Sequence, residues 1–237
     1  MPLKADEPPL GTAILDHVNA TSPNSSGTET VTSDHHVLDG GSLLHRVPWE
    51  KGISYDEVAM TYATFVSRRY FPPTVVFDGY EAGPSIKDPT HKRRNPVMKP
   101  EIQITVATKF AGKKDVLGKE SNKNQIIGLI LPPLRTEMCN AIQSRDDADF
   151  DIASSAVKSA RTKSTPVIGV DTDLLVLLLS QYDTAVHQEL YFLSQKQNCR
   201  KIFDIHRIMS CLGSHICKAL LFLQHIPDIW NRKAGRI

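Results

Sequence analysis

Three times in this chain a short apolar run is followed directly by an aspartate, and this pattern narrows the choice of fold more than any other part of the sequence. The runs lie at 37–38, 74–77 and 167–170, and they lead into Asp39, Asp78 and Asp171. Runs that are apolar at every position are typical of strands buried on both faces of a parallel sheet. Segments with helical periodicity lie between these runs. This alternation predicts a three-layer α/β/α fold, in which helices cover both faces of a mostly parallel sheet.

The clearest predicted helix begins at a capping box formed by Ser54 and Glu57, in which each side chain can bond the backbone N–H of the other residue. It ends before Pro72-Pro73, because proline has no N–H to donate. Weaker patterns predict the remaining elements. They are a strand at 102–106, a helix at about 122–138 disturbed at Pro132-Pro133, a strand at 138–143, a helix at 148–160, a hairpin formed by 190–193 and 201–205, and a helix at about 206–223.

The composition predicts how the chain is divided. Residues 1–34 are rich in Pro, Ser, Thr and Asn, which predicts a disordered tail. Residues 35–224 are expected to form one domain, and 225–237 a divergent C-terminal tail. The chain is 41% hydrophobic and 23% charged, as in ordinary globular proteins. It has no apolar run near the roughly 20 residues of a membrane helix and no secretory signal. An intracellular protein without membrane association is therefore expected, with nucleus and cytoplasm equally open.

Several classes of chemistry have no support in the sequence. The four cysteines show no zinc-type pairing, so free thiols are expected. No P-loop, G-x-G-x-x-G or G-x-S-x-G motif is present, which argues against nucleotide cofactors and serine hydrolase chemistry. His35 and His36 are expected to be solvated rather than to bind metal. Trp49 and Trp230 are expected in the core or a lid, with base stacking as the alternative.

Charge is distributed unevenly along the chain. Between residues 84 and 124 there are ten Lys or Arg and four acids, so this stretch carries +6 within a chain of net charge +2. Such a basic segment is expected where a protein grips nucleic-acid phosphate, although a solvated charged loop has the same composition. The candidate phosphate-binding residues are Lys87, Lys92, Arg93 and Arg94.

Six aspartates are candidate metal ligands and catalytic residues, because ligands of open α/β sheets bind at the carboxyl ends of the strands. They are Asp39, Asp78, Asp147, Asp149, Asp171 and Asp173. Taken singly, each has a structural explanation as a turn residue or a helix cap. Together, carboxylates at one sheet edge would need cations to neutralise them. Ligand sets made only of oxygen favour Mg²⁺ or Mn²⁺, and one or two such ions can hydrolyse a phosphodiester.

The same segments resemble the PIN and flap-endonuclease (5'-3' nuclease) superfamily. The resemblance covers about 37–223 and depends on 37–46 (VLDGGSLLHR), 75–80 (VVFDGY), 147–149 (DAD) and 169–175 (GVDTDLL). The segments 83–88 (GPSIKD) and 90–94 (THKRR) are similar to a group of uncharacterised animal PIN-like proteins with a transposon-like distribution. The resemblance implies that Asp39 and Asp78 are the first two metal ligands. It also implies that 147–149 and 171–173 supply two further acidic pairs, and that Lys87 and Arg93 grip phosphate.

The chain departs from this family near its C-terminus, where relatives carry a Gly-Cys-Asp-Thr-Thr turn that this sequence lacks. The resemblance therefore implies a C-terminally truncated PIN-like fold with one metal-binding motif missing. The expected function is a divalent-metal-dependent nuclease that cuts DNA or RNA with water as the nucleophile. The alternative is a catalytically degenerate PIN-like domain that binds nucleic acid or protein without cleavage, or a remnant with no activity.

Overall fold

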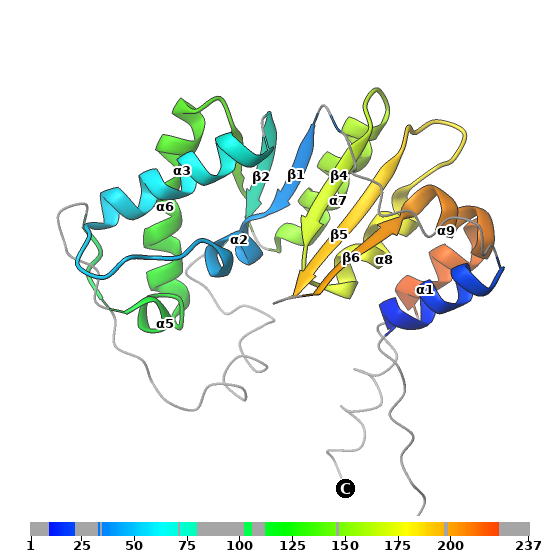
Figure 1. Ribbon diagram of the computed structural model, residues 1–237, viewed down its shortest axis with the longest axis horizontal. Coiled ribbons are helices and arrows are strands. Elements are labelled where there is room, and N and C mark those ends of the chain that lie inside the picture. The colour runs from blue at the N-terminus through cyan, green and yellow to red at the C-terminus, as the bar shows by residue number, and fades with distance from the viewer. Residues whose placement is uncertain are drawn as a thin grey trace, which may run out of the picture. The chain divides into compact units, whose positions relative to one another are not determined.

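Figure 1 shows the computed structural model, which describes residues 10–21, 33, 35–70, 72–79, 102–105, 112–145, 147–196 and 199–222. Strands among these residues form a sheet in the order β3-β2-β1-β4-β5-β6. They are β1 (His36–Asp39), β2 (Pro73–Phe77), β3 (Asn140–Gln143), β4 (Thr165–Gly169), β5 (Leu190–Lys196) and β6 (Cys199–Asp204). The pairs β2–β3 and β4–β5 are parallel, and β5–β6 is antiparallel. The predicted α/β class with a mostly parallel sheet is therefore confirmed.

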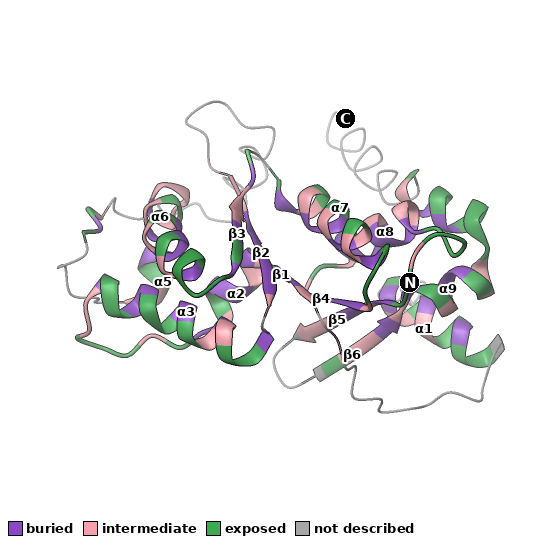
Figure 2. Cartoon of the chain, turned by 90° about the horizontal axis from the view of Figure 1, so that it is seen from above, coloured by how far each residue is buried: buried purple, intermediate pink, exposed green. Residues whose placement is uncertain are grey.

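The chain divides into two compact units, which we name the central unit (Leu38–Ala148) and the terminal unit (Met1–Val37 with Asp149–Ile237). Each unit contains a strand that is buried at every position, β2 in the central unit and β4 in the terminal unit. Figure 2 shows this burial along the strands and on the inner faces of the helices. The strands predicted to be buried on both faces at 74–77 and 167–170 are thus confirmed at 74–77 and 167–169, and Val170 is half-buried just after β4.

The central unit carries four described helices: α2 (Gly40–Arg46), α3 (Tyr55–Tyr70), α5 (Lys113–Val116) and α6 (Glu120–Thr136). The capping box of α3 is confirmed, because Ser54 N donates to Glu57 Oε2 at 2.7 Å and Glu57 N donates to Ser54 Oγ at 3.3 Å. The inner face of α3 packs against α6. It buries Tyr55, Val58, Ala59, Tyr62, Ala63, Val66 and Tyr70.

Helix α6 continues through Pro132 and Pro133, where the sequence predicts a disturbance. Each proline removes one i→i−4 hydrogen bond from the helix, and this loss commonly bends or ends it. Here the apolar face of the helix is buried at Ile126, Ile127 and Ile130, which have 0% exposure. Burial on this scale compensates for the missing hydrogen bonds, because tertiary packing supplies most helical stability in proteins.

The predicted strand at 102–106 is wrong for residues 102–105, which take no regular conformation, and residue 106 lies outside the described residues. Side chains of α6 bond this segment instead of a neighbouring strand. Ile102 N donates to Asn122 Oδ1 at 3.1 Å, and Ile104 N donates to Gln125 Oε1 at 3.0 Å. Gln125 Nε2 returns a bond to Ile102 O at 3.2 Å. The two amide side chains satisfy the backbone groups that a strand partner would otherwise satisfy.

The terminal unit contains α1 (Leu10–Thr21), α8 (Thr172–Gln181), α9 (Ile205–Leu212) and nearly all of α7 (Ala148–Ala160). The predicted helix at 148–160 and the predicted hairpin are both confirmed. The helix expected at about 206–223 is interrupted at Gly213, whose φ of +80° ends α9, and helical conformation resumes at 214–222. A glycine tolerates this positive φ because it has no Cβ.

The prediction of a disordered tail at 1–34 is wrong for residues 10–21, which form α1. Ile14 and Val18 lie one turn apart and are buried, at 5% and 2% exposure. The helix packs against α9, and Lys201 Nζ donates to Thr12 Oγ1 at 2.9 Å. One apolar stripe in a polar segment is enough to order a helix when a partner surface buries it. Residues 1–9, 22–32 and 34 lie outside the described residues.

Two further expectations concern membranes and cysteines. None of the helices described here combines the length and the hydropathy needed to cross a bilayer. Cys139, Cys211 and Cys217 are free, as predicted, and the Cys199 side chain lies outside the described residues. Burial raises the pKa of Cys217 and, together with the charge of Glu137, that of Cys139. These two thiols are therefore poor nucleophiles at neutral pH.

Candidate functional site

Two of the predicted aspartates of the central unit lie next to the same backbone position. Asp39 ends β1 and Asp78 directly follows β2. A Cβ built on Gly41 would lie 3.1 Å from Asp39 Oδ1 and 3.5 Å from Asp78 Oδ2. The two carboxylates, 39 residues apart in the chain, therefore flank one point at the start of α2. Both residues are only partly buried, so the pair is open to solvent.

Backbone amides orient one oxygen of each carboxylate. Asp39 is the N-cap of α2, and its Oδ1 accepts from Ser42 N at 3.1 Å. Asp78 Oδ1 accepts from Ala148 N, the first residue of α7, at 3.1 Å. A carboxylate has two oxygens with about four acceptor positions, so one bond to an amide fixes its direction and still permits further binding.

Glycines at this site allow a very close approach of backbone segments. A Cβ on Gly40 would collide with the Phe77 ring, and a Cβ on Gly79 would collide with the carbonyl groups of Ser144 and Arg145. The Asp-Gly dipeptides are therefore more than turn signals. Any larger residue after either aspartate would push its carboxylate away from the position it now takes.

The C-terminal end of α2 is held by Lys113, a member of the basic stretch. Lys113 Nζ donates to Val47 O at 2.6 Å and to His45 O at 2.9 Å, and it lies 5.4 Å from the centroid of the Trp49 ring. A cation at the carbonyl end and a carboxylate at the amide end both stabilise a helix. Burial lowers the pKa of Lys113 to about 8. Burial and then the charges of Lys123 and Lys113 lower the pKa of His45.

Trp49 packs within the central unit, as predicted. Its Nε1 donates to Tyr62 Oη at 2.7 Å, and Tyr62 Oη in turn donates to Leu44 O at 2.7 Å. The ring meets Tyr55 and Tyr62 edge-on. A ring engaged in this way braces α3 against α2 rather than offering a face for base stacking. Trp230 lies outside the described residues.

The acids of the terminal unit follow β4 and begin α7. Asp171 is the N-cap of α8, yet its side chain makes no capping hydrogen bond, and it is exposed. Asp173 is exposed in the first turn of α8, and Asp149 is half-buried in the first turn of α7. Asp147 belongs to the central unit and is exposed just before α7.

One strand-end aspartate was missed by the sequence analysis. Asp204 ends β6 and caps α9, and its Oδ1 accepts from Arg207 N at 2.9 Å. The preceding run, Ile202-Phe203, is the signal that could have revealed it. Because β6 runs antiparallel to β5, its carboxyl end lies at the edge opposite to that of β4 and β5, so Asp204 is a structural cap.

Of the remaining predicted acids, Asp147 and Asp149 flank Ala148, whose backbone N–H donates to Asp78 Oδ1. Among the residues that the structure describes, no three His, Cys, Asp or Glu side chains form a group able to hold a metal ion. Four predicted phosphate-binding residues lie outside the described part of the chain: Lys87, Lys92, Arg93 and Arg94. Comparison with protein-family models found no match, and comparison with curated proteins found no relative.

Proposed function

We propose that this chain is a divalent-metal-dependent nuclease that hydrolyses phosphodiester bonds in DNA or RNA, with Asp39 and Asp78 as metal ligands. The observation that carries the proposal is the convergence of these two carboxylates beside Gly41. Carboxylates that approach each other repel unless a cation neutralises them. The amide bond to one oxygen of each carboxylate would hold both side chains in place for such an ion.

The donor set fits Mg²⁺ or Mn²⁺. Both candidate ligands are carboxylates, and hard divalent ions prefer oxygen ligands. Each carboxylate already accepts one amide hydrogen bond, from Ser42 N or Ala148 N, which fixes its direction before an ion binds. Gly41 provides a surface without a side chain between them, so a hydrated ion or a phosphate oxygen can approach the backbone closely.

When bound, such an ion supplies a Lewis acid that lowers the pKa of a coordinated water and stabilises the leaving oxygen. The chain's own residues perform the other tasks. Asp39 and Asp78 hold the ion, while Ser42 N and Ala148 N keep the two carboxylates aimed. The basic residues Lys87, Lys92, Arg93 and Arg94 are proposed to neutralise the phosphates of the nucleic acid, as their charge allows.

The PIN-like fold and the other four aspartates belong to the same proposal. Asp147, Asp149, Asp171 and Asp173 are proposed as further metal-binding acids, as the resemblance of 147–149 and 169–175 to flap endonucleases implies. Asp171 has the strongest support, because it is exposed and makes no capping hydrogen bond to α8. An N-cap aspartate that does not cap its helix has no evident structural task.

The first test is calorimetric titration of the full chain with Mn²⁺. D39N and D78N keep an oxygen that can accept the amide bond but remove a negative charge, so we expect each to weaken binding at least about tenfold. The matched control is D56N, which changes an exposed aspartate of α3 in the same unit. Unchanged Mn²⁺ affinity in both D39N and D78N would show that these residues are not ligands.

The second test measures cleavage of labelled single-stranded and double-stranded DNA and RNA in Mg²⁺ and Mn²⁺. We expect metal-dependent cleavage that is lost in D78N and in the D171N/D173N variant and is retained in D56N. Metal binding without any cleavage would favour the degenerate nucleic-acid-binding domain instead. Trace cleavage of equal rate in all variants would be a contaminant, and the nuclease proposal would then be wrong.

A further inference from the structure

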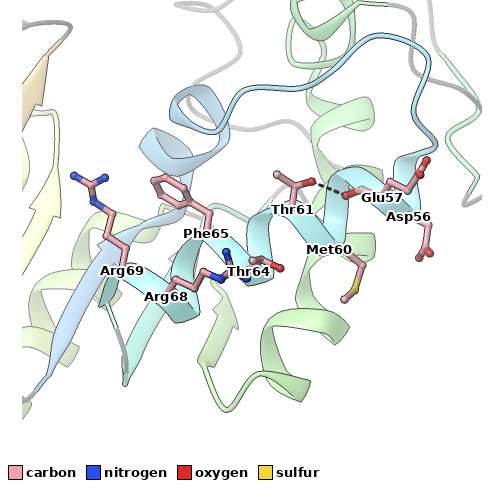
Figure 3. A pocket seen from close by; sticks show the side chains of 8 residues that line it. All are labelled: Asp56, Glu57, Met60, Thr61, Thr64, Phe65, Arg68 and Arg69. Carbon is pink, nitrogen blue, oxygen red and sulfur yellow. Dashed lines mark hydrogen bonds between the residues drawn. The ribbon is translucent and has the colours of Figure 1, made fainter.

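The outward face of α3 carries a surface hollow of about 640 Å³, and its lining residues change from acidic to basic along the helix. The lining residues are Asp56, Glu57, Met60, Thr61, Thr64, Phe65, Arg68 and Arg69. Figure 3 shows them along one helix, with the acids at one end and the arginines at the other. All are exposed except Phe65, which is half-buried, and Met60 is 47% exposed. The opposite face of α3 is the one that packs against α6.

The order of these residues is symmetric about the middle of the helix. Read from either end toward the centre, each acid has an arginine as its counterpart, Met60 has Phe65, and Thr61 has Thr64. The residues form two neighbouring i, i+4 rows: one holds Asp56, Met60, Thr64 and Arg68, and the other Glu57, Thr61, Phe65 and Arg69. A face of this kind is complementary to itself when turned end over end.

We propose that this face of α3 is the contact surface of a symmetric dimer, in which α3 of two copies of the chain pack antiparallel. A twofold axis through the middle of α3 places Asp56 against Arg69 of the second copy, and Glu57 against Arg68. It also places Met60 against Phe65 and Thr61 against Thr64. Each i, i+4 row of one helix then lies along the other row of its mate, as ridges pack in helix pairs.

Existing contacts within α3 are compatible with this arrangement. Glu57 accepts hydrogen bonds from Ser54 N and Ser54 Oγ. These bonds do not remove its negative charge, so Glu57 can keep them while it attracts Arg68 of the second copy. Thr61 Oγ1 donates to Glu57 O at 2.8 Å, the dashed line of Figure 3, so its hydroxyl proton is satisfied within α3 and needs no acceptor on the second copy. Arg69 Cζ lies 5.8 Å from the centroid of the Phe65 ring. The arginine therefore stays close to the apolar residue at the middle of the face while its charge points to the second copy's Asp56.

The size of the face predicts weak association. Thirteen helical steps separate Asp56 from Arg69, a length of about 20 Å. One helix face of this length buries less than the roughly 800 Å² per partner of a standard interface, so dissociation in the micromolar range is expected. The charge pairs set the orientation of the two helices, and they make association weaker at high salt.

The test is sedimentation velocity of the full chain at roughly 1 to 200 µM, the range in which small interfaces dissociate. We expect a concentration-dependent dimer for the natural sequence. D56R and R69D each replace two attractive pairs by two repulsive ones, because the axis counts every contact twice. Each is expected to raise the dimer dissociation constant by about tenfold or more. K51E, an exposed charge reversal in the same unit but outside the hollow, is the matched control and should leave association unchanged.

Rescue distinguishes this dimer from other arrangements. The double variant D56R/R69D exchanges the two charges and restores attraction only if position 56 faces position 69 of the second copy. An equimolar mixture of the two single variants should associate for the same reason. Circular dichroism melts verify that all variants are folded. A monomer at every concentration would overturn the proposal, as would single variants that associate normally or a double variant that stays monomeric.

Discussion

The junction between β1 and α2 and the junction between β4 and α8 follow the same plan in sequence, yet they differ in hydrogen bonding. At the first, Asp39 closes the strand and caps the helix through Ser42 N. At the second, Asp171 is in the N-cap position with extended backbone, but its carboxylate does not bond to α8. The comparison shows that the position of an aspartate between a strand and a helix does not by itself determine whether the side chain caps the helix. A cap accounts for Asp39 in part, and it does not account for Asp171.

The glycine after β2 and the glycine at the end of β4 also differ in their surroundings, and this difference gives the largest expected effect on stability. We expect G79A to lower the free energy of unfolding by at least about 3 kcal/mol, because its Cβ would meet the backbone carbonyls of Ser144 and Arg145. G169A should cost about 1 to 2 kcal/mol, because its Cβ would meet the ends of the Leu174 and Phe192 side chains, which can move.

Urea unfolding followed by circular dichroism measures both changes. G128A is the control, since no atom lies within 4 Å of its built Cβ and alanine favours the helix by up to about 1 kcal/mol. Equal losses of unfolding free energy in G79A and G169A would show that a clash with backbone atoms costs no more here than a clash with side-chain atoms.

The far end of α2 offers the next test. K113M removes the donor to His45 O and Val47 O, and unsatisfied carbonyls cost about 1 to 2 kcal/mol at neutral pH. The pH dependence has a definite sign. Burial lowers the pKa of Lys113 to about 8 from its ordinary 10.5, so between these values the unfolded chain binds more protons. The stability of the natural sequence should therefore rise with pH in this window, relative to K113M.

Urea titrations of both proteins at roughly pH 7.5 and 9.5 separate these contributions. K114M, which changes the exposed neighbouring lysine, controls for the loss of a surface charge. A stability difference that is the same at both pH values would show that Lys113 keeps an ordinary pKa.

The smallest expected effects test the difference between Asp39, which caps α2, and Asp171, which does not cap α8. D39A removes a cap and should cost about 1 kcal/mol, whereas D171A removes no capping bond and should cost less than about 0.5 kcal/mol. D204A, which removes the cap of α9 within the terminal unit, is the control for Asp171 and should also cost about 1 kcal/mol. If D171A is as damaging as D204A, Asp171 has a structural task and loses its special support as a metal ligand.

Sequence patterns predicted the parts of this fold that local chemistry determines. The capping box at Ser54 and Glu57 needs only its own residues. The apolar runs of β2 and β4 are sufficient to predict burial without knowing which residues cover them. The patterns failed where a distant partner decides. The stripe of Ile14 and Val18 is stable only because α9 buries it, and residues 102–105 are irregular because Asn122 and Gln125 take their backbone bonds.

In the candidate site, too, the sequence predicted some features and missed others. The sequence identified Asp39 and Asp78 as strand-end acids, and their approach to Gly41 follows from two short strands meeting at α2. It did not indicate that Asp39 caps α2 while Asp171 leaves α8 uncapped. That distinction depends on side-chain rotation within a single turn, which composition and periodicity do not encode. The role of Lys113 was also hidden, since the charge pattern gives no reason to separate it from its exposed neighbours.

The hydrogen bond from Trp49 to Tyr62 gives the central unit a built-in optical probe. The indole is edge-on to two tyrosines and close to an ammonium group, so its fluorescence will change when α2 and α3 separate. The chain has one other tryptophan, Trp230, and W230F leaves Trp49 as the single indole emitter. Opening of one half of the molecule can then be timed independently of the other by stopped-flow mixing.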